Sequence, residues 1–423
     1  MRKRGALKAL WKHPDPMRLL FGQAVSQLGD GVGLVALTLL VLDTTHSPSK
    51  LAWTAAARVT PQVVFLLIGG AIVDRFSRRI LLLISDFARG LLTAGLVLVL
   101  LTHTLHFWEL VVYSLTFGVF DALFFPAMSA LIPEIVPEDL LPAMNSLRPL
   151  SNNLMGQMIG PAIGGLLVAF STTWAIGLDC LTFFVSAGAL ALMRTTPRPT
   201  SSHTPNMWRE IREGLRYVRS TTWLWTTLAA VTLTNAFVIS PMGVLIPYFL
   251  RHHLHEGKAV VGYAFAVSGL SGSVGALISA NLSSPRRRVR MMWIYWSIST
   301  LAGLIMAVAT NLWLVLLFPL ITSPLILFGN VIWESMMQSE VPRELLGRTS
   351  SIDWFVSLGM MPVGLVVAGA LAKTLSVGTY YLVASLVSAV PGIAILLSRR
   401  ANAIDASRLS QNPAAAHRET TAP

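Results

Sequence analysis

Apolar segments of about 20 residues alternate with short polar segments along most of the 423-residue chain. An α-helix needs about 20 predominantly apolar residues to cross the hydrocarbon core of a bilayer. The pattern predicts an all-α, polytopic membrane protein with twelve transmembrane helices in two six-helix, pseudo-symmetric halves. The predicted spans are residues 17–42, 51–73, 80–102, 107–129, 144–170, 173–194, 222–250, 259–282, 290–310, 312–336, 350–372 and 377–398.

The composition also indicates a membrane protein rather than a soluble one. Hydrophobic residues make up 54% of the chain and charged residues only 12%, whereas a soluble protein carries about 25% charged residues. The basic N-terminal segment precedes an apolar stretch that is too long for a signal peptide and has no small-residue cleavage site, so we expect an uncleaved first span. Cys180 is the only cysteine, which excludes an intrachain disulfide and a thiolate metal cluster.

The net charge of +12 follows the predicted topology. Both termini and loops 2–3, 6–7, 8–9 and 10–11 lie on one face, which carries 25 of the 32 Lys and Arg residues. The opposite face carries four, and three more lie within spans. Because Lys and Arg are enriched in cytoplasmic loops, the basic face with both termini is predicted to be cytoplasmic. The predicted topology therefore accounts for the excess of positive charge, and we expect no nucleic-acid partner.

The chain is predicted to divide at its longest interior connection. Residues 1–194 would form the N-terminal half and residues 222–400 the C-terminal half. Between them, residues 195–221 are predicted to be a cytoplasmic linker with a basic amphipathic helix on the inner membrane surface. Residues 401–423 are polar and Ala-rich and are predicted to be a disordered tail.

A short internal repeat supports two equivalent halves. The sequence VPEDLLPAMNSL, which begins at Val136, resembles VPRELLGRTSSI, which begins at Val341. Each copy precedes a predicted span, the fifth and the eleventh. Parallel repeats would place the two copies at equivalent positions of their halves.

Four charged residues interrupt the chain between the second and third spans. The stretch reads Gly70-x-x-x-Asp74-Arg75-x-Ser77-Arg78-Arg79. It resembles the signature motif of the major facilitator superfamily, with a serine where the second glycine usually stands. The resemblance implies a role in an inner gate. The alternative is that the arginines only anchor the topology of the helices.

The resemblance also implies a partner for this motif at the start of the eleventh span. Ser350 and Asp353 have the spacing of a capping box there. Asp74 would accept hydrogen bonds from the exposed amides of that helix. One of the first two arginines of the motif would pair with an acid such as Asp353 or Asp121.

A glycine-rich pattern in the fifth span is similar to the antiporter motif of the drug exporters in the same superfamily. It comprises Gly156, Gly160, Pro161, Gly164 and Gly165. The spacing places glycines on one helix face, which allows close backbone approach, and the proline bends the helix. The alternative is tight helix packing without a role in antiport.

Other phrases are similar to the branch that holds macrolide-efflux proteins and the enterobactin exporter. They include SQLGDGVGLVAL, ARVTPQ, FFPAMSALIPEIVP and VPRELLGRTSSIDW. The fourth span lacks the arginine that is found in many drug–proton antiporters of other branches. The resemblance therefore does not imply a coupling mechanism that uses this arginine.

Charged residues inside predicted spans are candidates for transport chemistry, because a charge in hydrocarbon is costly and usually faces a cavity or a partner. Asp30 lies near the middle of the first span. It either binds a proton or a cationic substrate, or it bonds to neighbouring polar groups in helix packing. Arg58 of the second span is expected to pair with Asp30 or with Asp179.

Other charged residues are expected nearer the inner ends of their spans. Asp86 and Arg89 are three residues apart and are expected to form a structural ion pair on one helix face. Asp121, in the inner half of the fourth span, is expected in a gate network, with substrate contact and packing as alternatives. Glu334, near the inner end of the tenth span, is expected in a gate or an inner vestibule.

A charge asymmetry between two loops suggests a second latch. Residues 133–142 carry three acids and no Lys or Arg, whereas the loop between the eighth and ninth spans carries four arginines. The internal repeat would place these loops together, so that the acids and arginines attract one another. The alternative is that the arginines bind anionic lipid and enforce topology.

These features predict a secondary transporter, not an enzyme, that exports amphipathic small molecules of the drug or antibiotic type by proton antiport. Its partners would be a small-molecule substrate, protons and the bilayer of the cytoplasmic membrane. We expect no cofactor, no metal site and a monomer. The alternatives are a siderophore or metabolite exporter of the same fold and a non-transporting receptor or scaffold. Candidates to line a cavity are Phe117, Phe124, Asn235, Phe237 and Met242.

Overall fold

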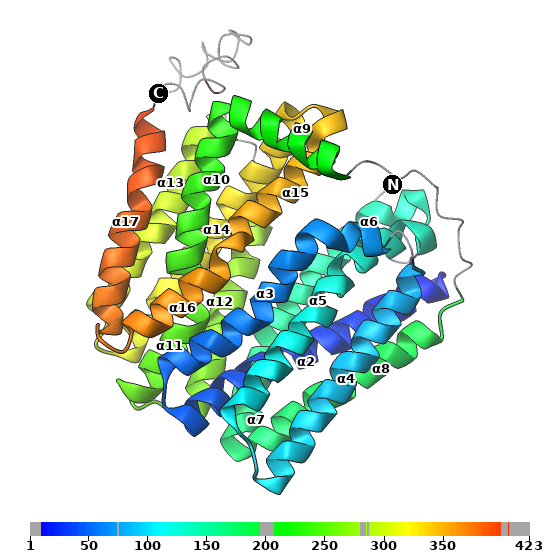
Figure 1. Cartoon of the computed structure of the whole chain (residues 1–423), viewed down its shortest axis with the longest axis vertical. Helices are drawn as coiled ribbons and strands as arrows, with labels where there is room; N and C mark the ends of the chain where they lie inside the picture. The colour runs from blue at the N-terminus through cyan, green and yellow to red at the C-terminus, as the bar shows by residue number, and fades with distance from the viewer. Residues whose placement is uncertain are drawn as a thin grey trace. The chain divides into compact units, whose positions relative to one another are not determined.

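Helices make up the regular structure of the residues that this computed structural model describes, 10–73, 76–194, 207–279, 285, 287–398 and 405 (Figure 1). Within them, eleven helical segments are long and apolar enough to cross a bilayer. The helix α3 (Pro48–Val73) adds a further 26-residue segment. The prediction of an all-helical, multi-pass membrane protein is confirmed.

Seven of the eleven segments are single helices and four are composite. The single helices are α2 (Pro14–Thr45), α4 (Arg78–Thr102), α5 (Phe107–Ile135), α8 (Thr172–Ala191), α12 (Lys258–Ser279), α14 (Leu312–Glu340) and α17 (Val377–Leu397). The composite segments are η1 (Glu138–Leu140) with α6 (Leu141–Ser151), η2 (Asn152–Ile159) and α7 (Gly160–Phe170); α10 (Thr222–Thr234) with η3 (Asn235–Ile239) and α11 (Met242–His252); α13 (Arg288–Leu301) with η4 (Ala302–Ala307); and α15 (Arg343–Gly359) with α16 (Met361–Leu371).

Contacts between Cα atoms divide the chain into two compact units. The first comprises Met1–His203, Pro241–Ser273 and Leu365–Thr374. The second comprises Thr204–Ser240, Val274–Gly364 and Leu375–Pro423. The boundaries given above for the two halves, the linker and the tail stay a prediction.

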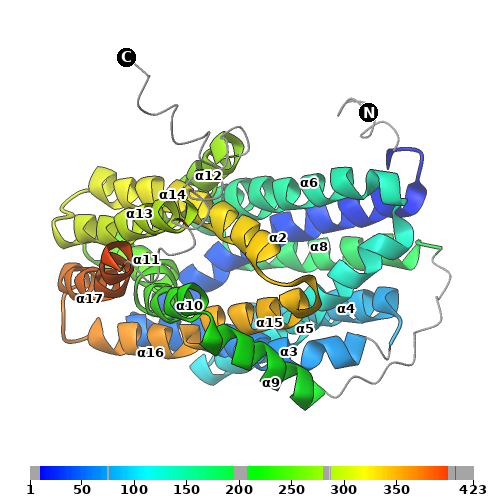
Figure 2. The ribbon, with the colours of Figure 1, turned by 90° about the horizontal axis from the view of Figure 1, so that it is seen from above.

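The first unit is built around α2. This helix packs along α7 and α8, while α3 lies along α5, and α4 contacts both α5 and α8 (Figure 2). Large apolar side chains from several of these helices are buried together, among them Leu19, Leu82, Leu131, Met144 and Leu190. The arrangement leaves the middle of α2 facing α3, α5 and α8, from which the polar residues described below project.

The second unit has a core rich in tryptophan. In this unit α13 packs on α14 and α17, and α10 packs on α15 and α17. Trp223, Trp293, Trp296 and Trp333 are buried in one apolar cluster. These indole rings are large and each carries one N–H donor, so the core of this unit combines apolar surface with polar atoms that need partners.

The two copies of the internal repeat adopt the same local conformation. Val136 ends α5 with φ −105° and ψ 127°, and Val341 ends α14 with φ −88° and ψ 131°. Each valine donates its amide hydrogen to the carbonyl oxygen four residues earlier. Pro137 and Pro342 follow, and each precedes the next helical turn. Because proline fixes φ near the helical value and lacks an N–H, it suits a helix start, so Val-Pro specifies the same turn twice.

Helix boundaries beside these turns correct two expectations. The helix α5 continues to Ile135, so Glu134 is helical and residues 133–142 are not a simple loop. The helix α15 begins at Arg343, so Ser350 lies inside it and the predicted capping box with Asp353 is wrong. A count of apolar residues identifies only the part of a helix that lies in hydrocarbon. The helices α5 and α15 also contain polar turns, so their ends differ from those of the predicted spans.

The amphipathic helix predicted between the halves is α9 (Met207–Ser220). Glu213 pairs with Arg348 of α15, and the Tyr217 hydroxyl donates to the Glu340 carbonyl oxygen at 3.4 Å. Val218 is buried in the tryptophan-rich core. One face of α9 therefore packs on protein, and its expected place on the inner membrane surface stays a prediction.

Only Asp405 is described within the predicted tail. Its carboxylate accepts hydrogen bonds from the backbone amides of Val289 and Arg290 at 3.2 and 3.1 Å. These amides belong to the first turn of α13, where backbone N–H groups have no partner within the helix and a negative charge is favourable. The remaining residues of the predicted tail lie outside the described part of the chain.

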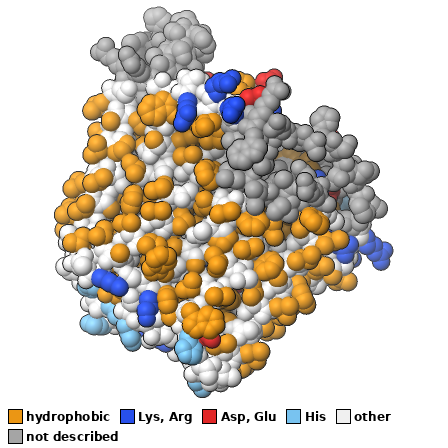
Figure 3. Space-filling view, in the orientation of Figure 1, with side chains coloured by type: hydrophobic (Ala, Val, Ile, Leu, Met, Phe, Trp, Pro, Cys, Tyr) orange, Lys and Arg blue, Asp and Glu red, His pale blue; other side chains and the backbone are white. Residues whose placement is uncertain are grey.

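Hydrophobic side chains cover most of the face shown in Figure 3, and the charged side chains in that view lie near helix ends. Phe170 exposes 88% of its surface and Leu397 exposes 80%. Soluble monomeric proteins rarely expose contiguous apolar surface of this extent. The exposed surface is therefore suited to lipid.

Gly165→Ala is expected to destabilise the protein, whereas Gly177→Ala is expected to leave its stability unchanged or higher. A Cβ at Gly165 of α7 would lie 2.8 Å from backbone atoms of Ala259 and Gly262, at α12, while no atom lies within 4 Å of a Cβ at Gly177 of α8. Overpacking costs about 1–3 kcal/mol, and alanine in place of an unhindered helical glycine stabilises by about 0.5–1 kcal/mol. Thermal unfolding in one detergent measures both variants, and equal melting temperatures would contradict the prediction.

Candidate functional site

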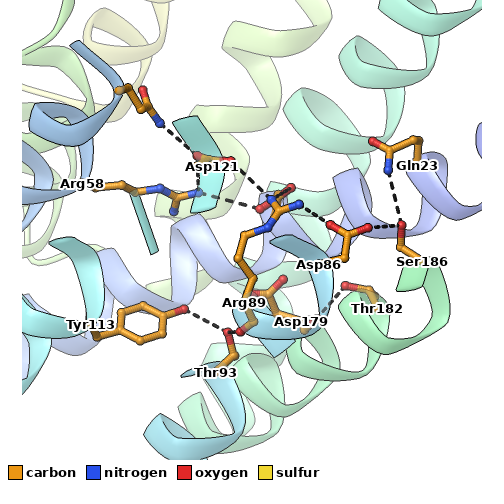
Figure 4. A network of polar contacts seen from close by, with 12 residues as sticks. Gln23, Arg58, Asp86, Arg89, Thr93, Tyr113, Asp121, Asp179, Thr182 and Ser186 are labelled. Atoms are coloured by element: carbon orange, nitrogen blue, oxygen red, sulfur yellow. Dashed lines mark hydrogen bonds and ion pairs between the residues drawn. The ribbon is translucent and has the colours of Figure 1, made fainter. Parts of the chain in front are cut away.

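Charged side chains from five helices of the first unit meet in its interior (Figure 4). We call this group the carboxyl cluster. It contains four acids and two arginines: Asp30 of α2, Arg58 of α3, Asp86 and Arg89 of α4, Asp121 of α5 and Asp179 of α8. The sequence identified each of these residues as a charge within a span, but it did not predict that all six lie together.

Arg89 is the most buried cation of the cluster. Its side chain exposes 2% of its surface and forms an ion pair with Asp86, which is fully buried. The predicted pairing on one face of α4 is confirmed. Asp86 also accepts a hydrogen bond from the Ser186 hydroxyl at 2.6 Å, and Ser186 accepts one from the Gln23 amide at 3.3 Å. A buried ion pair needs such additional bonds to offset the loss of water.

Arg58 lies between two carboxylates. Its Nη2 is 3.7 Å from Asp30 Oδ1 and 3.7 Å from Asp121 Oδ2. Asp121 also accepts a hydrogen bond from the Gln62 amide at 2.9 Å and one from Arg89 at 3.3 Å. The expected pairing of Arg58 with Asp30 is therefore confirmed. Residue 121 lies at the centre of α5, which continues to Ile135, and the expected position of Asp121 in the inner half of its span stays a prediction.

Aromatic rings cover the two guanidinium groups. Arg58 Cζ lies 4.3 Å from the ring centre of Phe117, and Arg89 Cζ lies 4.7 Å from the ring centres of Phe124 and Phe183. A cation above an aromatic face is attracted by the ring, and more strongly away from water. Phe117 and Phe124 are 1% and 8% exposed, so they enclose the arginines rather than line an open cavity as the sequence suggested.

Asp179 lies against two glycines of α2. A Cβ at Gly29 or at Gly33 would collide with its side chain, so the glycines on either side of Asp30 are what let α2 approach this carboxyl. The Oδ1 atom of Asp179 is buried and has no hydrogen-bond partner among the described residues. The same holds for Oδ1 of Asp30, which has only the Arg58 guanidinium at 3.7 Å.

The cluster holds more acids than bases. Four carboxyls share two guanidiniums, so the fully ionised cluster would carry a net charge of −2. An unpaired buried charge is costly, and such a group takes up a proton or a counter-cation instead. Among the described residues no set of three His, Cys, Asp or Glu side chains is placed to hold a metal ion. Proton uptake is one chemistry that would neutralise this excess of carboxylates.

The glycine motif of the fifth span packs against the same stretch of α2. Gly160 and Gly164 contact the backbone of residues 28–32, and a Cβ at either would be 2.9 Å or less from it. The preceding turns, η2, form a π-helix, a feature frequent at functional sites. The expected close backbone approach is confirmed for Gly160 and Gly164, and the bend expected at Pro161 stays a prediction. A role of the motif, including Gly156, in antiport stays a prediction.

The gate motif is described only in part. Gly70 lies in α3, and Asp74 and Arg75 lie outside the described residues. The expected pairing of Arg75 or Arg78 with Asp353 or Asp121 stays a prediction for Arg75, whereas Arg78 forms an ion pair with Glu134 of α5. The extension of α5 beyond its apolar part brings Glu134 within reach.

Arg79 of the same motif binds the end of another helix. Its Nε donates to the Leu190 carbonyl oxygen at 2.8 Å and its Nη2 donates to that of Ala191 at 2.6 Å. These carbonyls belong to the last turn of α8, where a positive charge is favourable. The two described arginines of the motif therefore tie α4 to α5 and α8.

The other two predicted site residues line a cavity within the second unit. Glu334 of α14 and Asp353 of α15 border a volume of about 420 Å³, together with Asn235 of η3. Asp353 accepts hydrogen bonds from the Trp333 indole N–H at 2.9 Å and from the Ser357 hydroxyl at 3.2 Å. Phe237 and Met242, two further cavity candidates, are not among its lining residues. The latch predicted between the acidic and arginine-rich loops stays a prediction.

The sequence analysis missed the tryptophans of this cavity. Trp293 and Trp296 are three residues apart on α13, and Trp333 precedes Glu334 on α14. The sequence did hold a signal for this cavity, because these tryptophans and Glu334 all lie inside predicted spans. It could not show that α13 and α14 bring these rings together.

Comparisons with known proteins agree with the fold. Residues 19–360 match the family described as Major Facilitator Superfamily. The chain is 28% identical over 400 residues to the multidrug efflux pump Tap of Mycolicibacterium fortuitum, which covers 92% of this chain and 96% of that protein. It is 24% identical over 373 residues to macrolide efflux protein A of Streptococcus pyogenes, which covers 85% and 90% respectively.

Solved structures with low sequence identity share the fold. A D-xylose–proton symporter superposes with a TM-score of 0.69 at 12% identity and covers 89% of this chain and 96% of that chain. A bacterial homologue of the iron transporter ferroportin in the inward-facing state has a TM-score of 0.68 at 17% identity, with 90% and 98% covered. At these identities the likeness shows the fold alone.

Arg89→Met is expected to destabilise the protein by about 3–5 kcal/mol, because it leaves Asp86 buried without its counter-charge. The same change at Arg58, whose side chain is 24% exposed, is expected to cost less. The double variant Asp86→Asn with Arg89→Met is expected to recover part of the loss, because no unpaired charge remains at that pair. Thermal unfolding of the purified variants measures the series. A double variant that melts below Arg89→Met would contradict the explanation.

Proposed function

The chain belongs to the major facilitator superfamily, and on that premise we propose that it exports amphipathic small molecules across the cytoplasmic membrane in exchange for protons. Members of this superfamily are multi-pass membrane transporters of small molecules and not enzymes. The carboxyl cluster is the proposed proton site. The cytoplasmic membrane, the direction of transport and the proton are parts of the proposal.

The excess of carboxyls over guanidiniums is the observation that carries the proposal. Two guanidiniums compensate two of the four carboxylates. The remaining negative charge lies in an interior of low dielectric constant, where neutralising it by protonation is favourable. A cluster built for structure alone would be expected to balance its charges, because an uncompensated buried charge destabilises the fold.

Asp30 is the proposed proton acceptor. Its side chain is 30% exposed, whereas that of Asp121 is 13% exposed and that of Asp86 is fully buried. Asp86 is also held by Ser186 and Arg89, so it is poorly placed to exchange a proton with water. Asp30 combines access to solvent with an oxygen that receives no hydrogen bond from described residues.

Arg58 is the proposed element that responds to the proton. It lies 3.7 Å from a carboxylate oxygen of Asp30 and equally far from one of Asp121. Protonation of Asp30 removes one of these two attractions, so the guanidinium is held by Asp121 alone. Since Arg58 and Asp30 come from different helices, α3 and α2 are then bound less tightly to one another. Loading of the proton would in this way change the free energy of helix packing.

The proposed substrate and direction rest on the relatives and on the charge distribution. Two relatives that match most of the chain are a multidrug efflux pump and a macrolide efflux protein. The enrichment of Lys and Arg on the face with both termini supports cytoplasmic termini. The exporter would then take its substrate from the cytoplasm or the inner leaflet.

Asp30→Asn is expected to abolish uphill transport of erythromycin and ethidium while preserving their downhill exchange. The amide keeps the shape of the side chain but cannot carry the proton. Everted membrane vesicles with an imposed proton gradient measure uphill uptake, with and without a protonophore. Counterflow in vesicles without a gradient measures exchange.

Asp15→Asn is the matched control for this test. Asp15 lies on the same helix but bonds to Arg18 and to the backbone of Arg194, away from the cluster. It should keep protonophore-sensitive uptake of the probes. Full gradient-driven transport by Asp30→Asn would exclude this residue as the proton site. If the unaltered protein transports neither probe uphill, the proposal of proton-driven efflux of such compounds is wrong.

A further inference from the structure

The cavity of the second unit is large enough for a small organic molecule. Its volume of about 420 Å³ is enclosed by α10, η3, α13, α14 and α15, and small-molecule pockets in proteins range over about 300–1,000 Å³. All its lining residues belong to the second unit. We call it the tryptophan cavity after Trp293, Trp296, Trp333 and Trp354, which line it.

Indole rings form much of the apolar lining. The ring centres of Trp293 and Trp296 are 5.4 Å apart, and those of Trp296 and Trp333 are 6.3 Å apart. Gly329 of α14 makes room for this arrangement, because a Cβ there would collide with the Trp296 indole. Trp faces bind aromatic groups by stacking and cations by their π-electrons.

The charge of the lining is entirely negative in the described residues. Glu334 and Asp353 line the cavity, and no Lys, Arg or His lines it within that part of the chain. Asp353 is fixed by one hydrogen bond to each carboxylate oxygen, from Trp333 and from Ser357. Glu334 has neither an ion pair nor a hydrogen bond to its side chain from a described residue. This lining attracts a cation and repels an anion.

Two polar atoms of the lining residues lack partners. Trp293 is 3% exposed and Thr227 is 1% exposed. The indole N–H of Trp293 and the hydroxyl of Thr227 have no hydrogen-bond partner among the described residues. Buried polar groups are nearly always hydrogen-bonded, and exceptions call for an explanation such as a missing ligand or water. These atoms are available to a bound molecule.

We propose that the tryptophan cavity binds an amphipathic organic cation with at least one aromatic ring. The cationic group lies beside Glu334 and Asp353, and the ring packs on the indoles of Trp293 and Trp296. A ligand with a hydrogen-bond acceptor gains a further contact from the Trp293 N–H. The inference rests on the proposed function in one respect: if the chain exports amphipathic molecules, such a ligand would also be an exported substrate.

Binding of tetraphenylphosphonium to the purified full chain in lipid nanodiscs tests this assignment. Equilibrium dialysis without a proton gradient measures the dissociation constant. Tetraphenylborate has nearly the same shape and the opposite charge, so it is the control for apolar binding. The unaltered protein is expected to bind the phosphonium and to bind the borate at least about tenfold more weakly, since the two carboxylates attract the cation and repel the anion.

Variants of the lining residues locate the bound cation. Glu334→Gln and Asp353→Asn are each expected to weaken phosphonium binding by about tenfold, because each removes one of the two negative charges of the lining. Glu344→Gln is the matched control, since this glutamate is exposed on α15 and does not line the cavity. Ser350→Trp keeps both acids but fills the cavity and should also weaken binding. Circular dichroism melting confirms that each variant is folded.

Equal phosphonium affinity in the unaltered protein, Glu334→Gln and Ser350→Trp would overturn the inference, as would equal affinity for the borate. If one variant fails to fold, the other and the borate comparison still decide. Because binding is measured without a gradient, the outcome is separate from that of proton-driven efflux. Cation binding by a protein that transports neither probe uphill would refute the proposed function and leave this site in place.

Discussion

Compensation of buried charge is the constraint on which the rest of the first unit depends. Arg58 and Arg89 each contact more than one carboxylate, and aromatic rings shield both guanidiniums from water. The low dielectric constant of such an interior strengthens every pairing and raises the cost of every unpaired charge. If the cluster takes up a proton as proposed, one proton changes the balance of charge among side chains from five helices.

Close helix approach is what makes the cluster possible. The α2 sequence places glycines at 29, 31 and 33, on both sides of Asp30. Two of them admit the Asp179 side chain, and Gly31 lies against the glycine motif of the fifth span. In a membrane, where lipid competes equally for apolar surface, small residues let helices gain van der Waals contact that larger side chains would prevent. The motif that resembles the antiporter signature thus has a direct physical effect at the level of Asp30.

The two units use intramembrane acids in different surroundings. In the first, carboxyls are paired with arginines and enclosed by phenylalanine. In the second, Glu334 and Asp353 line a cavity of about 420 Å³ with tryptophan and without a basic lining residue in the described chain. Paired acids hold helices together and respond to protons, whereas acids beside open aromatic surface favour a cationic ligand. The contrast lets proton binding and ligand binding be tested separately.

The sequence alone determined that the chain is all-helical and crosses a membrane several times, and that Asp86 pairs with Arg89. These features depend on hydrophobic length and on residues three apart along one helix, both of which are local. It also identified Asp30, Arg58, Asp121 and Asp179 as charges in spans, since such residues are rare and costly there.

Only the tertiary structure decided which of these residues meet. It joined the charges of α2, α3, α4, α5 and α8 into one cluster, gave Arg78 a partner in Glu134, and placed Asp353 beside Trp333 in a cavity instead of at a helix cap. These outcomes depend on where helices far apart in the chain approach one another. That approach is set by glycines such as Gly33 and Gly329, whose missing side chains leave no hydrophobic or charge pattern but decide which surfaces come into contact.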